Sequence, residues 1–405
     1  MRIVQKFGGT SVGSIERIQA TANIVKAEVD KGNEVAVVVS AMSGETNRLL
    51  ALAHEMNACP PAREVDALVA TGEQVTAALL AIALNKLGIS AYSMNGAQAG
   101  FKTAGKHAKA RIKSVHGERL IQHMQQGSVP VVTGFQGVDE QGNVTTLGRG
   151  GSDTSAVALA IAVKADSCDI YTDVDGIYTT DPRIEPKARK LDSISYEEML
   201  EFASLGAKVL QTRSVELGMR YNMPIHLRSS FNLVQGTRVT REDKDMERAE
   251  ISGVAYNRDE AKVTIKGIPD QPGIAAAVFG PVAEADINVD VIVQNISEDG
   301  LTDLTFTVPR NDYQATMDVL NTLCAKMGAK EVTGDNQVAK VSIIGVGMRS
   351  HSGVAKKMFE VLAKEKINIQ MITTSEIKIT VVFEEKYVDV AVRALHEAFG
   401  LAQAS

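Results

Sequence analysis

Residues 35–39 read VAVVV, an unbroken apolar run made almost entirely of β-branched side chains. Such a run offers no polar face to water, so it is typical of a strand buried on both sides within a parallel sheet. Residues 2–5, 129–134 and 168–172 carry similar short strand patterns, and helical patterns separate them. The first part of the chain is therefore predicted to be an α/β domain, with a mainly parallel open sheet between helices.

Helix signals lie where this alternation requires them. Ser14 can cap a helix that Gly32 ends. A helical pattern covers residues 63–87 with an interruption near Gly72, and another covers residues 152–165. Each pattern lies between two predicted strands, which is the order of a strand–helix–strand fold.

The character of the sequence changes near residue 230. Residues 232–250 are polar and charge-rich and predict a linker. Beyond them, residues 261–267 resemble residues 339–345, and residues 287–289 resemble residues 367–369. Each copy reads strand, glycine-containing loop, helix, strand, strand and helix, which predicts two ferredoxin-like βαββαβ modules. The predicted division is a first domain at 1–231, a linker at 232–250, and modules at 251–335 and 336–405.

Composition excludes several classes of protein. A net charge of −6 disfavours a general nucleic-acid binder, which would be basic. No run approaches about 18 consecutive apolar residues, so no membrane span is expected. The N-terminus has no apolar core of signal-peptide length. Because the three cysteines, Cys59, Cys168 and Cys324, are widely spaced, reduced thiols and a cytoplasmic location are expected.

Two glycine-rich segments each lead from a predicted strand into a helix. Residues 6–11 read KFGGTS, and residues 147–155 read LGRGGSDTS. Backbone N–H groups at a helix N-terminus attract phosphate, and Lys6 and Arg149 add full charges. Alone, each segment could be a turn that needs glycine for its dihedral angles, and Asp153 could be a helix cap. Together they suggest two anions held face to face, as phosphoryl transfer requires.

Other polar residues follow predicted strands or begin helices. In an open α/β sheet, ligands lie beyond the carboxyl ends of the strands, so Asp173 or Asp181 could meet a ribose, an adenine edge or water on Mg²⁺. The alternative is that both belong to Asp-Gly and Asp-Pro turns. Glu73 could bind an ammonium group, or it could lie on a solvated helix face. Ser40 ends the buried strand at 35–39 and could touch a ligand.

Residues 100–107, GFKTAGKH, nearly match the phosphate-binding P-loop pattern. His107 stands where Ser or Thr would hold Mg²⁺, and no β-branched strand leads into the segment. The segment is interpreted as a basic loop.

In combination, the motifs resemble those of the aspartate kinases. The motifs that carry the resemblance, in order, are KFGGTS at 6–11, SAM at 40–42, TGE at 71–73, GRGGSD at 148–153 and YTDVDG at 171–176. The repeat resembles the paired ACT modules of that family. The resemblance covers essentially the whole chain and is to the monofunctional bacterial type. It implies the amino acid kinase fold for the first domain.

The resemblance also implies a reaction. The γ-phosphoryl group of ATP, with Mg²⁺ mainly on its phosphates, would pass to the β-carboxylate of L-aspartate. The product, 4-phospho-L-aspartate, would enter lysine, threonine, methionine and diaminopimelate synthesis. No metal site of the protein's own and no general base are expected, because a carboxylate is already ionised at neutral pH.

Roles follow for the residues that match the family motifs. Lys6 would neutralise charge on the transferring phosphoryl group, and Asp153 would orient Lys6. The implied ATP-binding residues are Lys6, Phe7, Gly8, Gly9, Ser40, Thr172, Asp173, Tyr178, Asp181, Pro182, Arg183, Lys208 and Val209. The implied aspartate-binding residues are Thr46, Glu73, Arg149, Gly150, Gly151 and Ser152.

The ACT modules imply feedback inhibition by lysine, threonine or both. The implied effector residues of the first module are Asp270, Gly273, Ile274, Ala275, Asn288, Val289, Asp290 and Gln294. Those of the second module are Asn368, Ile369, Thr374, Ser375 and Glu376. Residues 350–353 read SHSG where the first module has DQPG at 270–273, so the two sites are not expected to be equivalent. The alternative is that the modules only dimerise.

Assembly and activity leave alternatives open. The edge strands of ACT modules predict a homo-oligomer. Met246, in the predicted linker, could start a second, shorter subunit and give an α₂β₂ assembly, or it could be an ordinary linker residue. The chain could instead be another enzyme of the same fold, acting on glutamate, N-acetylglutamate, carbamate or UMP. It could also be a non-catalytic amino-acid sensor.

Overall fold

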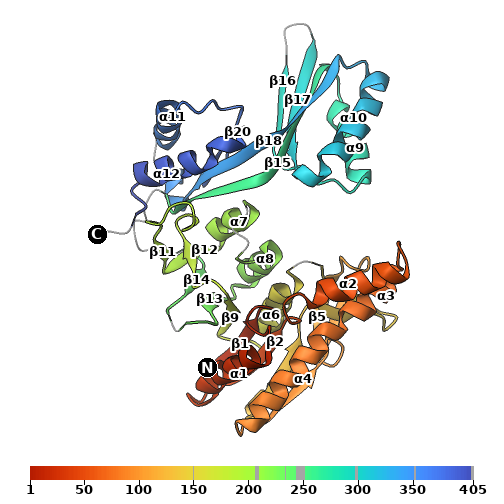
Figure 1. The fold of residues 1–405 in the computed structure, drawn as a ribbon, viewed down its shortest axis with the longest axis vertical. Helices are drawn as coiled ribbons and strands as arrows, with labels where there is room; N and C mark the ends of the chain where they lie inside the picture. Colours follow the sequence, from red (N-terminus) through yellow and green to blue (C-terminus); the bar gives the residue numbers. More distant parts are fainter. Residues whose placement is uncertain are drawn as a thin grey trace. The chain divides into compact units, whose positions relative to one another are not determined.

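The computed structural model describes residues 1–148, 150–205, 209–232, 234–242, 251–296, 300–350 and 353–402 (Figure 1). Two compact units divide the chain. The first contains Met1–Tyr178, Lys190–Ser204 and Lys208–Met246, and the second contains Thr179–Arg189, Leu205–Ala207 and Glu247–Ser405.

The first unit is built on an eight-stranded sheet in the order β12-β14-β13-β9-β1-β2-β6-β3. Its strands are β1 (Arg2–Phe7), β2 (Glu34–Val39), β3 (Ala91–Met94), β6 (Val129–Thr133), β9 (Ser167–Thr172), β12 (Ser193–Ser195), β13 (Ile225–Ser229) and β14 (Thr237–Thr240). All neighbours are parallel except β13 and β14, which confirms the predicted mainly parallel sheet. In register, Phe7 lies opposite both Val39 and Tyr171. The carboxyl ends of β9, β1 and β2 therefore meet at one edge of the sheet.

Helices cover the sheet on both faces (Figure 1). They are α1 (Ile15–Val29), α2 (Glu45–Met56), α3 (Ala62–Val69), α4 (Thr71–Lys86), α5 (Glu118–Gln125), α6 (Gly151–Ala162), α7 (Tyr196–Ser204) and α8 (Thr212–Tyr221). The residues at 35, 37 and 39 pack with α1 and α4, while Ala36 and Val38 are equally buried and face the opposite way. Burial on both faces explains why this strand has no polar residue.

The helix signals in the sequence are mostly confirmed. The Ser14 hydroxyl accepts a hydrogen bond from the Arg17 N–H at 3.3 Å and caps α1. The interruption predicted near Gly72 lies at Ala70, between α3 and α4. The stretch Ala62–Lys86 is long and apolar enough to cross a membrane by length and composition, but half of its most apolar segment is buried inside the protein. This burial is also expected of a core helix in a soluble fold.

Two short sheets complete the first unit. One is four-stranded, in the order β5-β4-β7-β8, and the other pairs β10 with β11. Their strands are β4 (Phe101–Ala104), β5 (Arg111–Val115), β7 (Gln136–Val138), β8 (Val144–Thr146), β10 (Ile177–Tyr178) and β11 (Lys190–Leu191). The basic loop predicted at 100–107 is therefore partly wrong, because β4 lies within it. The linker predicted at 232–250 is also wrong in part, because β14 belongs to the main sheet.

The second unit contains one six-stranded sheet in the order β16-β17-β15-β18-β20-β19. Its strands are β15 (Gly253–Pro269), β16 (Ile292–Ile296), β17 (Leu301–Val308), β18 (Glu331–Ile344), β19 (Met371–Thr374) and β20 (Lys378–Glu384). Its helices are α9 (Ile274–Glu284), α10 (Tyr313–Met327), α11 (Val354–Lys364) and α12 (Val388–Ala398), with short 3₁₀ turns η1 (Arg310–Asp312), η2 (Val346–Ser350) and η3 (Glu385–Tyr387). Two βαββαβ modules share this sheet, as the repeat predicts.

The two modules are interleaved along the chain. The first half of β15, residues 253–257, pairs with residues 340–344 of β18 and completes the sheet of the second module. The second half of β15 pairs with β17 and with the first half of β18, in the sheet of the first module. The first module is thus inserted between two neighbouring strands of the second. The predicted boundary between 251–335 and 336–405 differs, because it assigns residues 253–257 to the first module.

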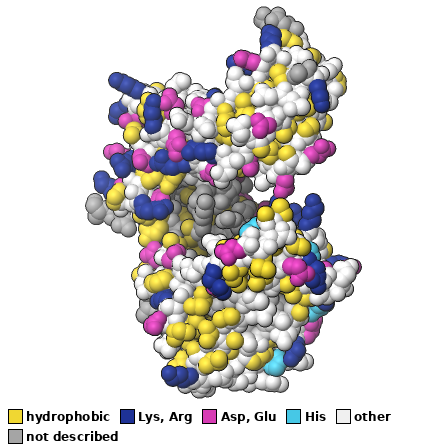
Figure 2. Space-filling model, turned by 45° about the vertical axis from the view of Figure 1, so that its right-hand side comes forward, with side chains coloured by type: hydrophobic (Ala, Val, Ile, Leu, Met, Phe, Trp, Pro, Cys, Tyr) yellow, Lys and Arg dark blue, Asp and Glu magenta, His cyan; other side chains and the backbone are white. Residues whose placement is uncertain are grey.

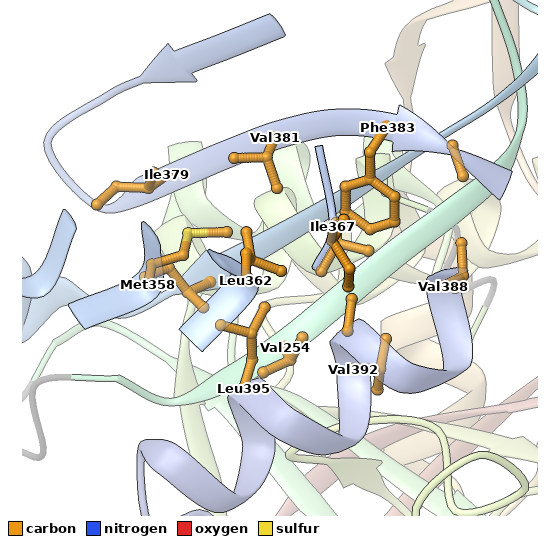
Figure 3. Close-up of a cluster of buried hydrophobic side chains, with 14 of the residues drawn as sticks. Val254, Met358, Leu362, Ile367, Ile379, Val381, Phe383, Val388, Val392 and Leu395 are labelled. Carbon is orange, nitrogen blue, oxygen red and sulfur yellow. The ribbon is translucent and has the colours of Figure 1, made fainter. Parts of the chain in front are cut away.

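Each module has its own apolar core. Figure 3 shows the core of the second module, where Val381 and Phe383 of β20 lie against Leu362 of α11 and Leu395 of α12. Val254 of β15 belongs to this core, which explains why the strand at 253–257 stays with the second module. A separate cluster of buried residues on β15, β17, α9 and α10 forms the core of the first module.

Candidate active site

The carboxyl edge of the parallel sheet gathers three of the sequence motifs. Gly8 and Gly9 follow β1, Ser40 follows β2, and Asp173 follows β9. The Gly8 N–H donates to the Tyr171 carbonyl at 3.1 Å, and the Ser40 N–H donates to the Phe7 carbonyl at 3.1 Å. These bonds continue the sheet register into the loops, so the loops leave the sheet side by side. They also occupy the Gly8 N–H, which leaves phosphate recognition to other backbone donors.

Lys6 and Asp153 form an ion pair at this edge. Lys6 Nζ lies 2.7 Å from Asp153 Oδ1, and the two side chains are only 10% and 12% exposed. Lys6 comes from β1 and Asp153 from the first turn of α6. Because water is largely excluded, the attraction between the two charges is stronger than it would be at the surface. The pair joins the two glycine-rich segments that the sequence analysis singled out.

The reading of Asp153 as a helix cap is wrong. Gly150 is the N-cap of α6, in a left-handed conformation with φ of 69°, and no side chain caps the helix. A Cβ at Gly150 would lie 2.1 Å from Gln211 Cγ, so both the dihedral angle and the space require glycine. Gly9 has a similar constraint, because a Cβ there would lie 3.0 Å from the Ala41 carbonyl oxygen. Asp153 is therefore free to face Lys6.

Glu73 is buried at the start of α4 and is only 3% exposed. Its Oε1 accepts a hydrogen bond from the Ala41 N–H at 3.2 Å, next to Ser40 at the end of β2. Its Oε2 is buried and has no hydrogen-bond partner among the described residues. Burial raises the pKa of Glu73 to about 7. The reading of Glu73 as a solvated helix face is wrong, and its unpartnered oxygen suits a cationic ligand.

The other predicted residues of the first unit differ in their surroundings. The Thr172 hydroxyl donates to Asp173 Oδ1 at 3.0 Å, and the Tyr178 hydroxyl donates to Asp175 Oδ1 at 3.0 Å. Phe7, Gly151 and Ser152 are buried, Thr46 and Val209 are half-buried, and Asp173 and Gly150 are exposed. Arg149 and Lys208 lie outside the described residues.

Asp181, Pro182 and Arg183 belong to the second unit. Arg183 pairs with Asp181 at 2.7 Å and also donates its backbone N–H to Asp181 Oδ1 at 2.9 Å. The Tyr256 hydroxyl donates to Asp181 Oδ2 at 2.9 Å. The hydrogen bonds from Arg183 are the largest cause that lowers the pKa of Asp181. This local pattern is the turn that the sequence analysis left open as the alternative for Asp181.

Two of the predicted effector residues, Gln294 and Thr374, lie on opposite edge strands of the six-stranded sheet. Gln294 is exposed on the edge strand β16, and Thr374 is exposed on the other edge strand, β19. Gln294 belongs to the first module and Thr374 to the second. Ile274 is 8% exposed and packs into the core of its module, so only its backbone can face a ligand. Residues 351 and 352, where the two modules differ, lie outside the described residues.

A buried lysine that the sequence did not single out holds one of the predicted effector residues. Lys340, on β18, is 2% exposed and pairs with Glu260 at 2.5 Å and with Asp290. Desolvation of Glu260 raises its pKa, although Lys340 opposes this shift. Asp290 therefore links the two modules within one chain. A lone lysine in a strand pattern carries no sequence signal for such a pairing.

The charged side chains on the surface are mixed. On the face shown in Figure 2, Lys and Arg side chains lie among Asp and Glu side chains in each unit. This distribution matches the modest net charge of −6.

Comparisons with known proteins cover the whole chain. The model of the amino acid kinase family matches residues 1–229, and two ACT domain models match residues 263–325 and 341–399. An aspartate kinase of Stutzerimonas stutzeri is 59% identical over 98% of this chain and 97% of its own length. An aspartokinase of Pseudomonas aeruginosa is 58% identical with the same coverage.

Solved structures agree with these relatives. Escherichia coli aspartokinase III in complex with aspartate and ADP is 27% identical, covers 98% of this chain and 99% of that chain, and has a TM-score of 0.83. The same enzyme in complex with lysine and aspartate is 27% identical, with the same coverage and a TM-score of 0.78. The similarity includes both the first unit and the paired modules.

Proposed function

The chain belongs to the aspartate kinase family, and from this premise we propose how the groups at the carboxyl edge of its first unit carry out the reaction. Aspartate kinases move the γ-phosphoryl group of ATP to the side-chain carboxylate of L-aspartate and form 4-phospho-L-aspartate. The observation that carries the assignment of the site is the buried pair of Lys6 and Asp153, which joins both glycine-rich segments at that edge.

Lys6 neutralises the charge that spreads over the phosphoryl oxygens during transfer, and Asp153 holds the Lys6 ammonium in place. A carboxylate oxygen of aspartate attacks the γ-phosphorus, and the bond from that phosphorus to the ADP oxygen breaks. The attacking group is already ionised at neutral pH, so no residue needs to remove a proton. The protein acts mainly by positioning the reactants and stabilising charge. Mg²⁺ arrives with the nucleotide as MgATP.

Glu73 receives the ammonium group of aspartate. Its unpartnered, buried Oε2 supports this role, because such an oxygen is costly to leave without a donor. Arg149 holds the α-carboxylate of aspartate, with Gly150, Gly151 and Ser152 forming the wall of the pocket and Thr46 lining it. Ser40, Thr172, Asp173, Tyr178 and Val209 of the first unit contact the nucleotide, together with Lys208.

Trapping of the acyl phosphate by hydroxylamine tests the reaction and separates it from its alternatives. Enzyme and MgATP are incubated with L-aspartate, L-glutamate or N-acetyl-L-glutamate, and hydroxamate is measured. We expect hydroxamate from L-aspartate and little from the other two acids. Hydroxamate chiefly from glutamate or N-acetylglutamate would favour another kinase of the same fold. ATP binding without hydroxamate from any acid would favour an amino-acid sensor.

The paired ACT modules bind an amino-acid effector, which we propose to be lysine, threonine or both. The complex of the Escherichia coli enzyme with lysine supports this class of ligand. Because Gln294 and Thr374 lie at opposite edges of one sheet, a site that contains both needs a second copy of the chain. We therefore propose a homo-oligomer in which β16 of one copy lies beside β19 of another. We also propose that the enzyme is cytoplasmic.

Ser375→Phe is expected to relieve feedback inhibition without lowering activity. Ser375 is exposed beside β19, and a phenyl ring there would fill the space of a small zwitterion. Inhibition curves with lysine, threonine and their mixture, measured by the hydroxamate assay, should move to at least about tenfold higher effector, since allosteric couplings are typically worth ~1–3 kcal/mol. Asn321→Phe, at an exposed position of α10, is the matched control and should leave the curves unchanged. Unchanged inhibition in Ser375→Phe would exclude this site.

We also propose that Met246 starts a second, shorter subunit. Met246 lies outside the described residues, between the strand β14 and the paired modules. Natively expressed protein should give two bands on a denaturing gel, and Met246→Leu should remove the shorter one while the full-length band remains. A single band of full length from the unmodified gene would contradict the proposal.

A further inference from the structure

Asp66, on α3, is a fully buried carboxylate that no sequence motif singles out. Four donors surround it. The Thr146 hydroxyl lies 2.5 Å from Oδ1, His107 Nδ1 lies 2.7 Å from Oδ2, and the backbone N–H groups of Thr146 and Ala108 lie at 3.1 Å. A buried carboxylate with this many donors fixes the chain segments that carry those donors relative to one another.

The groups that Asp66 holds lead directly to the described residues 147, 148, 150 and 151, which we call the substrate loop. Thr146 ends β8, and the loop begins at the next residue. Ala108 has an unusual positive φ of 64°, and its N–H is held by Asp66. The Ala108 carbonyl oxygen lies against Gly148, where a Cβ would be only 2.9 Å away. Asp66 therefore fixes both the start of the substrate loop and the chain that packs on it.

Arg213, on α8, supports the same loop from a different element. Its Nη1 donates to the Leu147 carbonyl at 2.8 Å, and its Nη2 donates to the Ala110 carbonyl at 3.3 Å. The Ala110 N–H in turn donates to the Thr146 carbonyl at 3.0 Å. Within the loop, the Gly151 N–H donates to the Gly148 carbonyl at 3.0 Å and leads into α6. The loop is thus held at its first residues and at the helix that follows.

We propose that Asp66 is a positioning residue for aspartate, acting through Thr146 and the substrate loop. This inference rests on the proposed function, which places aspartate at this loop through Gly150 and Gly151. Asp66 itself touches no reactant. Its effect should appear in the KM for aspartate and hardly in the KM for ATP, because the ATP-binding residues on β1 and β9 are held by other bonds. A purely structural role would instead lower stability and change the KM for aspartate no more than a matched buried variant on the same strand does.

The test removes one hydrogen bond and keeps the shape. Thr146→Val deletes the hydroxyl that donates a hydrogen bond to Asp66 Oδ1, and Thr146→Ser keeps that hydroxyl. Thr145→Val is the matched control, because Thr145 is equally buried on the same strand and its hydroxyl pairs with Thr103 at 2.6 Å instead. We expect Thr146→Val to raise the KM for aspartate about tenfold, the size expected for a lost hydrogen bond to a charged group. The KM for ATP should change less than about twofold, and Thr146→Ser and Thr145→Val should resemble the unmodified enzyme.

Two outcomes separate this inference from the proposed function. Arg149→Ala is measured in the same assays as a test of the loop itself. A raised KM for aspartate in Arg149→Ala, with no change in Thr146→Val, would overturn the positioning role of Asp66 and leave the proposed site intact. No change in Arg149→Ala would overturn the placement of aspartate at the loop. An equal rise in Thr145→Val and Thr146→Val would reduce Asp66 to a structural residue.

Discussion

Lys6→Ala is expected to lower kcat by about 10²–10³-fold, because removing one preorganised charge-stabilising group typically has an effect of this size. Lys6 lies in the pair with Asp153 at the carboxyl edge of the sheet, where both glycine-rich segments meet. The hydroxamate assay with saturating ATP and aspartate measures the effect. Lys26→Ala is the matched control, because Lys26 forms an exposed ion pair with Asp30 and should leave kcat unchanged.

Loss of Lys6 also leaves Asp153 buried without its partner. An unpaired buried charge destabilises a fold, so the melting temperature of Lys6→Ala should fall although the protein still folds. The double variant Lys6→Ala with Asp153→Asn should recover part of that stability and none of the activity. Near-normal turnover in folded Lys6→Ala would remove Lys6 from the mechanism.

Glu73→Gln is expected to weaken aspartate binding by about tenfold or more, because the ammonium group loses a charged acceptor. Burial raises the pKa of Glu73 from its ordinary value of 4.5 to about 7. The proton is therefore bound more tightly in the folded state. Since aspartate needs the ionised form, the affinity of the unmodified enzyme for aspartate should fall as the pH drops below about 7. Titration of aspartate binding across pH 6 to 8 checks this.

The same pKa sets how stability depends on pH. Because the pKa of Glu73 is raised in the folded state, its contribution to the free energy of unfolding is fully present below about pH 4.5. This contribution is lost as the pH rises through about 7. The loss is about 3.5 kcal/mol at most, from ~1.4 kcal/mol for each pKa unit. At pH 8, Glu73→Gln should therefore be more stable than the unmodified protein, as urea unfolding would show. Lower stability of Glu73→Gln at that pH would contradict the burial of an ionisable group at this position.

The local features of the fold could be predicted from the sequence, because they depend on neighbouring residues. A strand buried on both faces must be apolar throughout, as residues 35–39 are, and a helix start favours a side chain such as Ser14. The interleaving of the two modules could not be predicted in this way. Residues 253–257 pair with residues 340–344, and nothing near either segment records that pairing.

The site was predictable to a similar extent. Lys6 and Asp153 carry recognisable glycine-rich surroundings, and the packing of α6 on β1 then brings them together. The burial of Glu73 depends on how α4 packs on the end of β2, and a helical pattern alone does not reveal it. Asp66 and Lys340 act through partners that are distant in the sequence, so no local pattern signals them.

A crystal structure of the protein with ADP and L-aspartate tests the central claim most directly. We predict that Lys6 Nζ lies within hydrogen-bond distance of the terminal phosphate of ADP. We also predict that the aspartate ammonium group contacts Glu73 Oε2, with the aspartate side-chain carboxylate directed at that phosphate. Nucleotide and aspartate bound away from the carboxyl edge of β1, with Lys6 still paired only with Asp153, would contradict the account.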